Sequence, residues 1–228
     1  MEKLVKEAEE LAAQGVKELI LVAQETTVYG KDLYGKKSLH ILLKKLCEIR
    51  GIRWIRVLYC YPEEIYDELI ETIRDEKKIC HYLDIPIQHA SDRILKRMGR
   101  RTSKQELIDI IGKLRKEIPD IVLRTTLITG FPGETEEDHE ELKEFVDEME
   151  FDRLGVFTYS PEENTPAAEM ADQVPEEVKE ERRDELMELQ QEISYDRGQD
   201  RIGQELLVMI EGKVADESAY IGRTYGDA

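Results

Sequence analysis

The sequence is poor in cysteine, in histidine and in long apolar runs. Only three cysteines, Cys47, Cys60 and Cys80, occur among 228 residues, and their spacing is not that of a disulfide framework. Scattered thiols in odd number are typical of a reducing cytoplasm, so we expect a cytoplasmic location. No stretch of about 18 apolar residues is present, which excludes a membrane-spanning helix and predicts no membrane partner.

Basic residues are scarce relative to acidic ones. The chain has 33 Lys and Arg against 51 Asp and Glu, a formal net charge of −18. This balance disfavours binding of nucleic acid over a wide surface. It is compatible with a basic protein partner, or simply with solubility. One local exception could contact phosphate or an acidic patch, or form a solvated helix face. It comprises Arg93, Lys96, Arg97, Arg100, Arg101 and Lys104.

Apolar runs that alternate with amphipathic segments predict an α/β fold. The expected strands lie at residues 18–23, 54–59, 82–87, 121–128 and 152–158, and helices are expected at 38–50, from 62, 91–98, 103–117 and 135–148. Five strands that are each followed by a helix indicate a parallel sheet or barrel. For the helix at 103–117 we expect a capping box of Thr102 and Gln105.

Both ends of this alternation suggest a piece of a longer protein. The series opens with a helix, residues 2–14, so a first strand is expected upstream. A long acidic helix at 175–196 is followed by only two strands, which cannot bury a core alone. We therefore expect a main α/β unit, residues 1–197, and the beginning of a second unit, residues 198–228.

The carboxyl tips of the expected strands carry unusual residues. The apolar run at 121–128 ends in Gly130-Phe-Pro-Gly133, a turn that suits close approach of the backbone to a ligand. The other tips read Ala23-Gln-Glu-Thr-Thr27, Tyr59-Cys-Tyr-Pro62, Pro86-Ile-Gln-His-Ala-Ser91 and Tyr159-Ser-Pro-Glu-Glu-Asn-Thr-Pro166. Because the carboxyl ends of parallel strands meet at one edge, five such tips predict one composite site.

Taken together, these motifs resemble those of the radical S-adenosylmethionine methylthiotransferases. The matching segments are residues 21–30, 84–101, 124–135 and 159–168, so that the resemblance extends over essentially the whole chain. It implies an incomplete (β/α) TIM-like barrel that is missing its first strand, followed by the start of a small all-β TRAM domain. A further N-terminal domain would precede the barrel.

Two branches of this family differ within the motifs. His89, Ala90, Glu162 and Glu163 are similar to the branch that modifies a ribosomal protein, whereas the tRNA-modifying branch typically has other residues at these positions. Asn164 replaces the glycine usual in the family, and asparagine tolerates the left-handed conformation that such a turn requires.

The resemblance implies an enzyme, a methylthiotransferase that acts on an aspartate of the twelfth ribosomal protein of the small subunit. The partner would be this basic protein, and nucleic acid would be contacted only through the TRAM domain or the ribosome. The alternatives are a tRNA adenosine methylthiotransferase and a non-catalytic recognition or scaffold domain.

The implied cofactors are S-adenosylmethionine and two 4Fe–4S clusters. The family ligates one cluster through a Cys-x3-Cys-x2-Cys loop, which this chain lacks, because Cys47, Cys60 and Cys80 fall on different elements. We expect these thiols to be buried structural residues, no metal site in the chain, and no activity from this stretch alone.

Nine residues are candidates for binding the cofactor, while catalytic residues stay unassigned. They are Gln24, Glu25, Gln88, Ser91, Arg124, Thr125, Gly130, Phe131 and Tyr159. Gln24 and Glu25 would hold its ammonium group or fix their own turn. Gln88 and Ser91 would meet ribose or carboxylate oxygens, or cap the next helix.

Arg124 is a cation inside an apolar strand and therefore needs a carboxylate, for which we favour that of the cofactor over a structural Asp or Glu. Thr125 and Thr126 must face opposite sides of the strand, so only one can point into the barrel. Gly130 and Phe131 would contact adenine and Tyr159 would close the far edge. His89 is expected to be structural.

Overall fold

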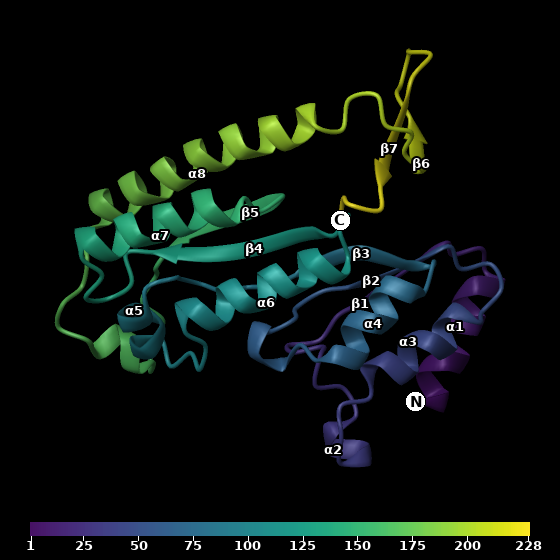
Figure 1. Cartoon of the computed structure of the whole chain (residues 1–228), viewed down its shortest axis with the longest axis horizontal. Coiled ribbons are helices and arrows are strands. Elements are labelled where there is room, and N and C mark those ends of the chain that lie inside the picture. Colours follow the sequence, from purple (N-terminus) through teal and green to yellow (C-terminus); the bar gives the residue numbers. More distant parts are fainter.

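The computed structural model describes residues 1–228 (Figure 1). The helices are α1 (Glu2–Ala13), α2 (Lys31–Tyr34), α3 (Leu39–Cys47), α4 (Asp67–Asp75), α5 (Asp92–Arg97), α6 (Lys104–Glu117), α7 (Glu136–Met149) and α8 (Glu176–Gln199). The strands are β1 (Glu18–Leu21), β2 (Trp54–Val57), β3 (Ile79–Asp84), β4 (Val122–Thr129), β5 (Arg153–Thr158), β6 (Val208–Lys213) and β7 (Tyr220–Thr224). The predicted α/β alternation is confirmed.

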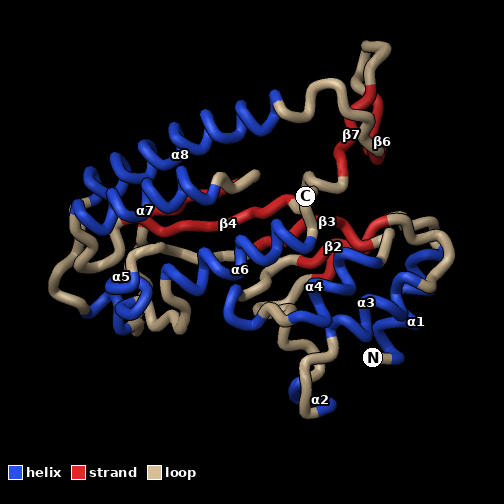
Figure 2. Tube along the Cα trace, in the orientation of Figure 1, coloured by secondary structure: helices blue, strands red, loops and turns tan.

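Strands β1 to β5 form one parallel sheet in sequence order, which leaves β1 and β5 as its edges (Figure 2). One face of this sheet packs against the helices in a single core of 35 buried residues. Leu123 and Leu127 of β4 belong to this core, as do Leu142 and Phe145 of α7 and Leu186 of α8. Helix α8 lies over β4 and β5 and reaches the strand tips with its first turns.

Two expected elements differ most from the structure. Strand β3 ends at Asp84, earlier than expected, because Pro86 has no N–H to give to a sheet, and only Gln88 rejoins β4 through an isolated bridge to Leu127. Residues 62–64 form a separate 3-10 turn before α4.

The predicted capping box of α6 also differs from the observed one by one residue. It is made by Ser103 and Glu106, whose side chains each bond the backbone N–H of the other. The hydroxyl of Thr102 instead donates to Glu63 at 2.9 Å.

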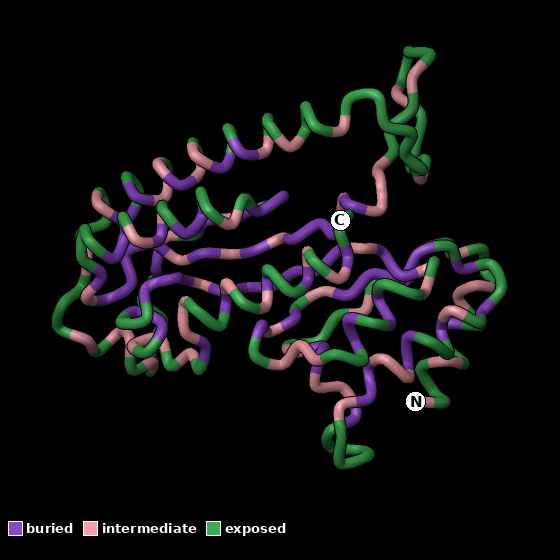
Figure 3. The backbone as a smooth tube through the Cα atoms, in the orientation of Figure 1, coloured by how far each residue is buried: buried purple, intermediate pink, exposed green.

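The other face of the sheet is partly covered by the end of the chain. Trp54, Cys80, Tyr82 and Val122 form a small buried cluster there, against which Tyr225 packs. The two strands β6 and β7 form an antiparallel hairpin beside it, which is largely exposed (Figure 3).

Buried charges fasten the chain end to this face. Arg56, fully buried, contacts Glu18 at 2.9 Å and donates to the backbone oxygen of Tyr225 at 2.7 Å. Arg223 of β7 also pairs with Glu18. The amino-terminal end of the sheet is thereby closed by the chain itself.

No helix of this structure combines the length and the apolar character needed to cross a bilayer.

Candidate functional site

The five strand tips meet at the carboxyl edge of the sheet, as predicted. Backbone hydrogen bonds of 2.8–3.0 Å connect each tip to its neighbour: Thr26 N–H to Tyr59 O, Cys60 N–H to Asp84 O, Gln88 N–H to Thr126 O and Tyr159 N–H to Thr129 O. A ligand at this edge would therefore meet residues from every strand.

Three of the five non-glycine residues with a left-handed backbone conformation lie at these tips, together with Gly130. The φ angles are 56° at Tyr59, 71° at Gln88, 70° at Gly130 and 64° at Asn164. Such conformations are unusual for residues other than glycine and cluster at functional sites. Asn164 adopts the conformation that we expected of it.

The first tip holds Gln24 and Glu25 in different roles. Gln24 is exposed and makes no hydrogen bond to the protein. The carboxylate of Glu25 accepts backbone N–H bonds from Thr27 and Tyr61, each at 2.8 Å, and so joins the β1 and β2 tips. Burial raises the pKa of Glu25 above its usual value, although these bonds oppose the shift. Glu25 thus fixes its own turn, one of the two predicted roles.

Arg124 has an internal carboxylate partner, the structural alternative to the cofactor carboxylate that we favoured. Its Nη1 contacts Asp84 Oδ1 at 2.7 Å, and the two residues lie side by side in the register of β3 and β4. The Arg124 side chain is 39% exposed, however, and its other nitrogens make no protein hydrogen bond. They stay available to a second acceptor.

Thr125 faces away from the open side of the sheet. It is fully buried on the helix side of β4, where its hydroxyl donates to Ile85 O at 2.8 Å. Thr126 lies on the opposite face, the face of Arg124, and is only partly buried.

Ser91 and His89 are tied into the protein. Ser91 is buried at the start of α5 and its hydroxyl donates to Asp138 Oδ1 at 2.7 Å, while its N–H donates to His89 Nδ1 at 3.0 Å. His89 is completely buried. Ser91 therefore braces α5 against α7, and His89 has the structural position expected of it.

Gly130, Phe131 and Tyr159 form the apolar end of the site. The rings of Phe131 and Tyr159 meet edge to face with centroids 5.2 Å apart, and Ile94 completes the buried cluster. The hydroxyl of Tyr159 is buried without a partner. At Gly130 a Cβ atom would lie 2.1 Å from Lys179 Cγ of α8, so no larger residue fits.

Sequence reasoning missed Glu134, in the turn after β4, and Asp138, in the first turn of α7. The Glu134 carboxylate is fully buried and accepts from the backbone N–H of Gly130 at 2.8 Å and from Arg182 Nη1 at 2.9 Å. The available signal was an acid four residues after Gly130, at the start of a helix. Asp138 at α7 accepts from Ser91, from Arg93 and from the N–H of Thr135.

Most of the basic cluster serves internal contacts. Arg93 pairs with Asp138, Arg97 with Asp172 at 2.8 Å and Lys104 with Glu141 at 3.2 Å, and Arg100 stacks on Tyr61. Lys96 and Arg101 stay exposed without such partners.

The three cysteines do not approach a common point. Cys60 and Cys80 are buried in two different clusters, and Cys47 is half-buried at the end of α3. Burial raises the pKa of Cys47 to about 12 and that of Cys80 to about 11. Cys60 and Cys80 are buried, as expected of all three thiols, whereas Cys47 is only half-buried.

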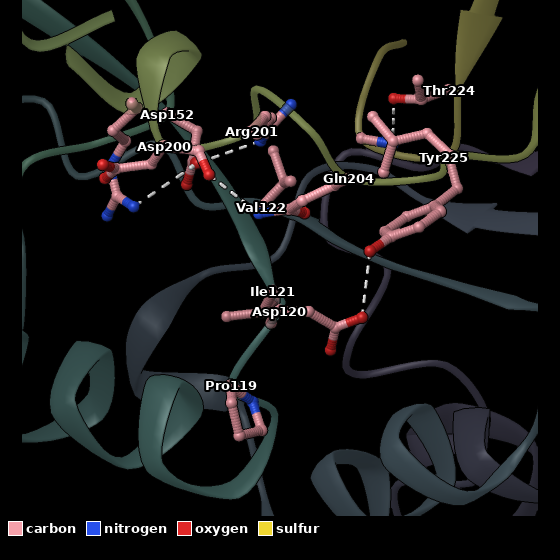
Figure 4. A pocket seen from close by; sticks show the side chains of 13 residues that line it. Pro119, Asp120, Ile121, Val122, Asp152, Asp200, Arg201, Gln204, Thr224 and Tyr225 are labelled. Atoms are coloured by element: carbon pink, nitrogen blue, oxygen red, sulfur yellow. Dashed lines mark hydrogen bonds and ion pairs between the residues drawn. The ribbon is translucent and has the colours of Figure 1, made fainter.

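Two cavities lie elsewhere on the sheet, and the second of them reaches the β1 tip at Ala23, Glu25 and Thr26. A polar one of about 260 Å³ lies between α8, the start of β4 and the chain end, where Asp152 faces Arg201 and Tyr225 donates to Asp120 (Figure 4). An apolar groove of about 580 Å³ follows the free edge of β1 and is lined by Leu4, Leu11 and Leu21 among others.

Comparison with known proteins identifies relatives at two levels. The family model described as "Radical SAM superfamily" matches residues 1–146. The chain is 68% identical over 228 residues to the ribosomal protein uS12 methylthiotransferase RimO of Lachnoclostridium phytofermentans, and 57% identical over 225 residues to that of Clostridium perfringens. These alignments cover 100% and 99% of this chain but 52% and 50% of the relatives, so the chain spans about half their length.

Solved structures share the fold at low identity. The archaeal Elp3 of Methanocaldococcus infernus has a TM-score of 0.54 at 16% identity, with 82% of this chain and 48% of that chain covered. The radical S-adenosylmethionine methyltransferase TsrM of Kitasatospora setae has a TM-score of 0.53 at 17% identity, with 68% and 30% covered.

Proposed function

Because the chain belongs to the radical SAM superfamily, as its motifs indicated, we propose that it forms the α/β part of an enzyme that methylthiolates an aspartate of ribosomal protein uS12. The identity of 68% to a uS12 methylthiotransferase along the whole chain is the observation that supports this most. We propose a cytoplasmic location, since its protein substrate would belong to the ribosome.

The carboxyl edge suits S-adenosylmethionine as the bound molecule. It offers the unpaired side chain of Gln88 for a hydroxyl and the apolar surface of Phe131 and Tyr159 for a ring. The free guanidinium nitrogens of Arg124, on the open face of the first half of β4 and beside Asp84 at the end of β3, are available for a carboxylate. Bound there, the cofactor supplies the radical precursor. The protein's own residues bind and orient it and exclude water.

The same residues do not fit an iron–sulfur cluster. No three of the chain's His, Cys, Asp and Glu residues are grouped so that they could hold a metal ion. We propose that both clusters of the whole enzyme are held by residues outside this chain, and we assign no step to them here.

Two further elements of the whole protein are proposed from open surfaces. The free edge of β1, with its apolar groove and with Ile20 and Val22 exposed, suits pairing with another strand. Hairpin β6–β7 exposes Val208, Ile210 and Tyr220, which suits a small all-β domain such as TRAM that begins near residue 198.

The test uses the whole protein under anaerobic reducing conditions, with S-adenosylmethionine, purified uS12 and total tRNA in the same reaction. Mass spectrometry should find the methylthio increment on an aspartate-containing peptide of uS12. The tRNA digest should contain no new methylthioadenosine. An unmodified uS12 with modified tRNA would replace this assignment by the tRNA-modifying alternative.

A further inference from the structure

Two neighbouring tips of the site hold the left-handed backbone conformation, Gln88 after β3 and Gly130 after β4. They belong to one unit, because Ile128 N–H donates to Gln88 O at 2.8 Å just before the second turn begins. A residue such as Gln88 keeps this conformation only where its surroundings impose it.

A single buried carboxylate touches both turns. Oε2 of Glu134 accepts from the N–H of Gly130 at 2.8 Å and of Phe131 at 3.3 Å, and it lies 3.5 Å from Nε2 of His89, the residue after Gln88. Since His89 Nδ1 accepts from Ser91 N–H, the neutral ring carries its proton on Nε2. That atom has no hydrogen-bond partner in this structure, and its contact with the Glu134 oxygen is at 3.5 Å.

The other oxygen of Glu134 is held by α8. Arg182 Nη1 lies 2.9 Å from Oε1, and the side chains of both residues are almost completely buried. Burial alone would raise the pKa of Glu134, but His89, the Gly130 N–H and Arg182 together hold it below its usual value. The carboxylate is therefore a permanent buried charge with partners from three segments.

Both oxygens accept from protein donors and the Glu134 side chain is fully buried, so it is not exposed to a ligand at the edge. We propose that Glu134 is a positioning residue, which fixes the Gln88–His89 and Gly130–Phe131 turns against α8 so that the carboxyl edge is preformed for its cofactor. This rests on the proposed function only in naming S-adenosylmethionine as that cofactor.

The variant that tests this is Glu134→Gln in the whole protein. A glutamine has one acceptor oxygen, so its NH2 group must face either the two turn amides or Arg182, and one set of bonds is lost. The matched control is Glu136→Gln. Glu136 is exposed and accepts from the other terminal nitrogen of Arg182 at 3.1 Å. The control substitution therefore removes one negative charge beside the same arginine and leaves the bonds to the two turns in place.

Two measurements report the effect, hydrogen exchange and equilibrium binding of S-adenosylmethionine. Glu134→Gln should raise exchange about ten-fold in peptides covering 86–91 and 128–134 while α3 and α6 stay protected, because the loosening is local. Cofactor binding should weaken about ten-fold, as for other residues that act through a contact residue. Glu136→Gln should leave both unchanged.

Binding within about two-fold of wild type, despite loosened turns, would overturn the proposal, and so would exchange that rises equally in α3 and α6. If Glu134→Gln does not fold, His89→Asn takes its place. The Oδ1 atom of the new asparagine still accepts from Ser91 N–H, but the contact with Glu134 is lost. We then expect faster hydrogen exchange only in the peptide covering 86–91, together with weaker binding of S-adenosylmethionine. Neither readout involves uS12, so a failure of methylthiolation would count against the proposed function alone.

Discussion

The two ends of the central sheet both contain buried charges, but the charges have different partners. At the carboxyl edge, Glu134 and Asp138 accept bonds from backbone N–H groups of turns and so determine loop shape. At the amino edge, Arg56 and Glu18 bind the end of the chain, at Tyr225 and Arg223. Buried ion pairs add little stability in general, but removing one partner is costly. The charges at the carboxyl edge leave that edge open to a ligand and hold its loops in place. Those at the amino edge bind residues 223–225 over the sheet.

The largest effect is expected at the turn after β4. Gly130→Ala places a methyl group on Lys179 and strains a φ of 70°, so the free energy of unfolding should fall by about 3 kcal/mol. Gly35 has nearly the same φ, 71°, with nothing within 4 Å, so Gly35→Ala should cost only about 1 kcal/mol. Urea unfolding measures both. Equal losses would mean that α8 does not confine the turn.

Removing Arg56 should open the amino edge alone. Arg56→Met deprives Glu18 of one partner and Tyr225 of another, with a cost of about 2 kcal/mol because Arg223 still pairs with Glu18. Cys80 lies beneath Tyr225 and should become open to alkylation. Cys60, in the main core, should stay protected. Labelling followed by peptide mass spectrometry distinguishes them, and equal labelling would contradict separate roles for the two edges.

A smaller effect concerns pH at the carboxyl edge. Burial alone would raise the pKa of Asp138, but hydrogen bonds from Arg93, Ser91 and Thr135 hold it far below the usual range. Its stabilisation is therefore present above the unfolded pKa of about 4 and is lost as pH falls toward the folded value. The melting temperature of Asp138→Asn should change less than that of wild type between about pH 5 and pH 3.

The exposed Asp147 on the same helix provides the control for this titration. Asp147→Asn should follow the wild-type curve. If Asp138→Asn follows it too, the buried network does not depend on that charge.

Most of the fold could be predicted from sequence, because apolar periodicity and glycine or proline turns are local signals. The predicted range of strand β3 lay too far toward the carboxyl end, because Pro86 interrupts the hydrogen bonds between strands inside an otherwise apolar run. The capping box of α6 was misplaced because two overlapping pairs, Thr102 with Gln105 and Ser103 with Glu106, both match the pattern. Choosing between the two pairs requires knowledge of the tertiary contacts, because the hydroxyl of Thr102 donates a hydrogen bond to Glu63.

The site was less predictable, since its contacts are distant in sequence. Arg124 was known to need a carboxylate, but only the register of β3 and β4 brings Asp84 beside it. The face of Thr125 depends on the same register. Glu134 was overlooked because a helix-starting acid is ordinarily exposed, and its burial follows from α8, whose Arg182 lies 48 residues away.

One measurement tests most directly whether the carboxyl edge is the ligand site and the amino edge a closed end. Hydrogen exchange of the whole protein is compared with and without S-adenosylmethionine. We expect protection in peptides covering 22–28, 86–91 and 126–132, and no change in those covering 118–122 and 222–227. Protection in the peptides covering 118–122 and 222–227, with none in those covering 22–28, 86–91 and 126–132, would contradict the assignment.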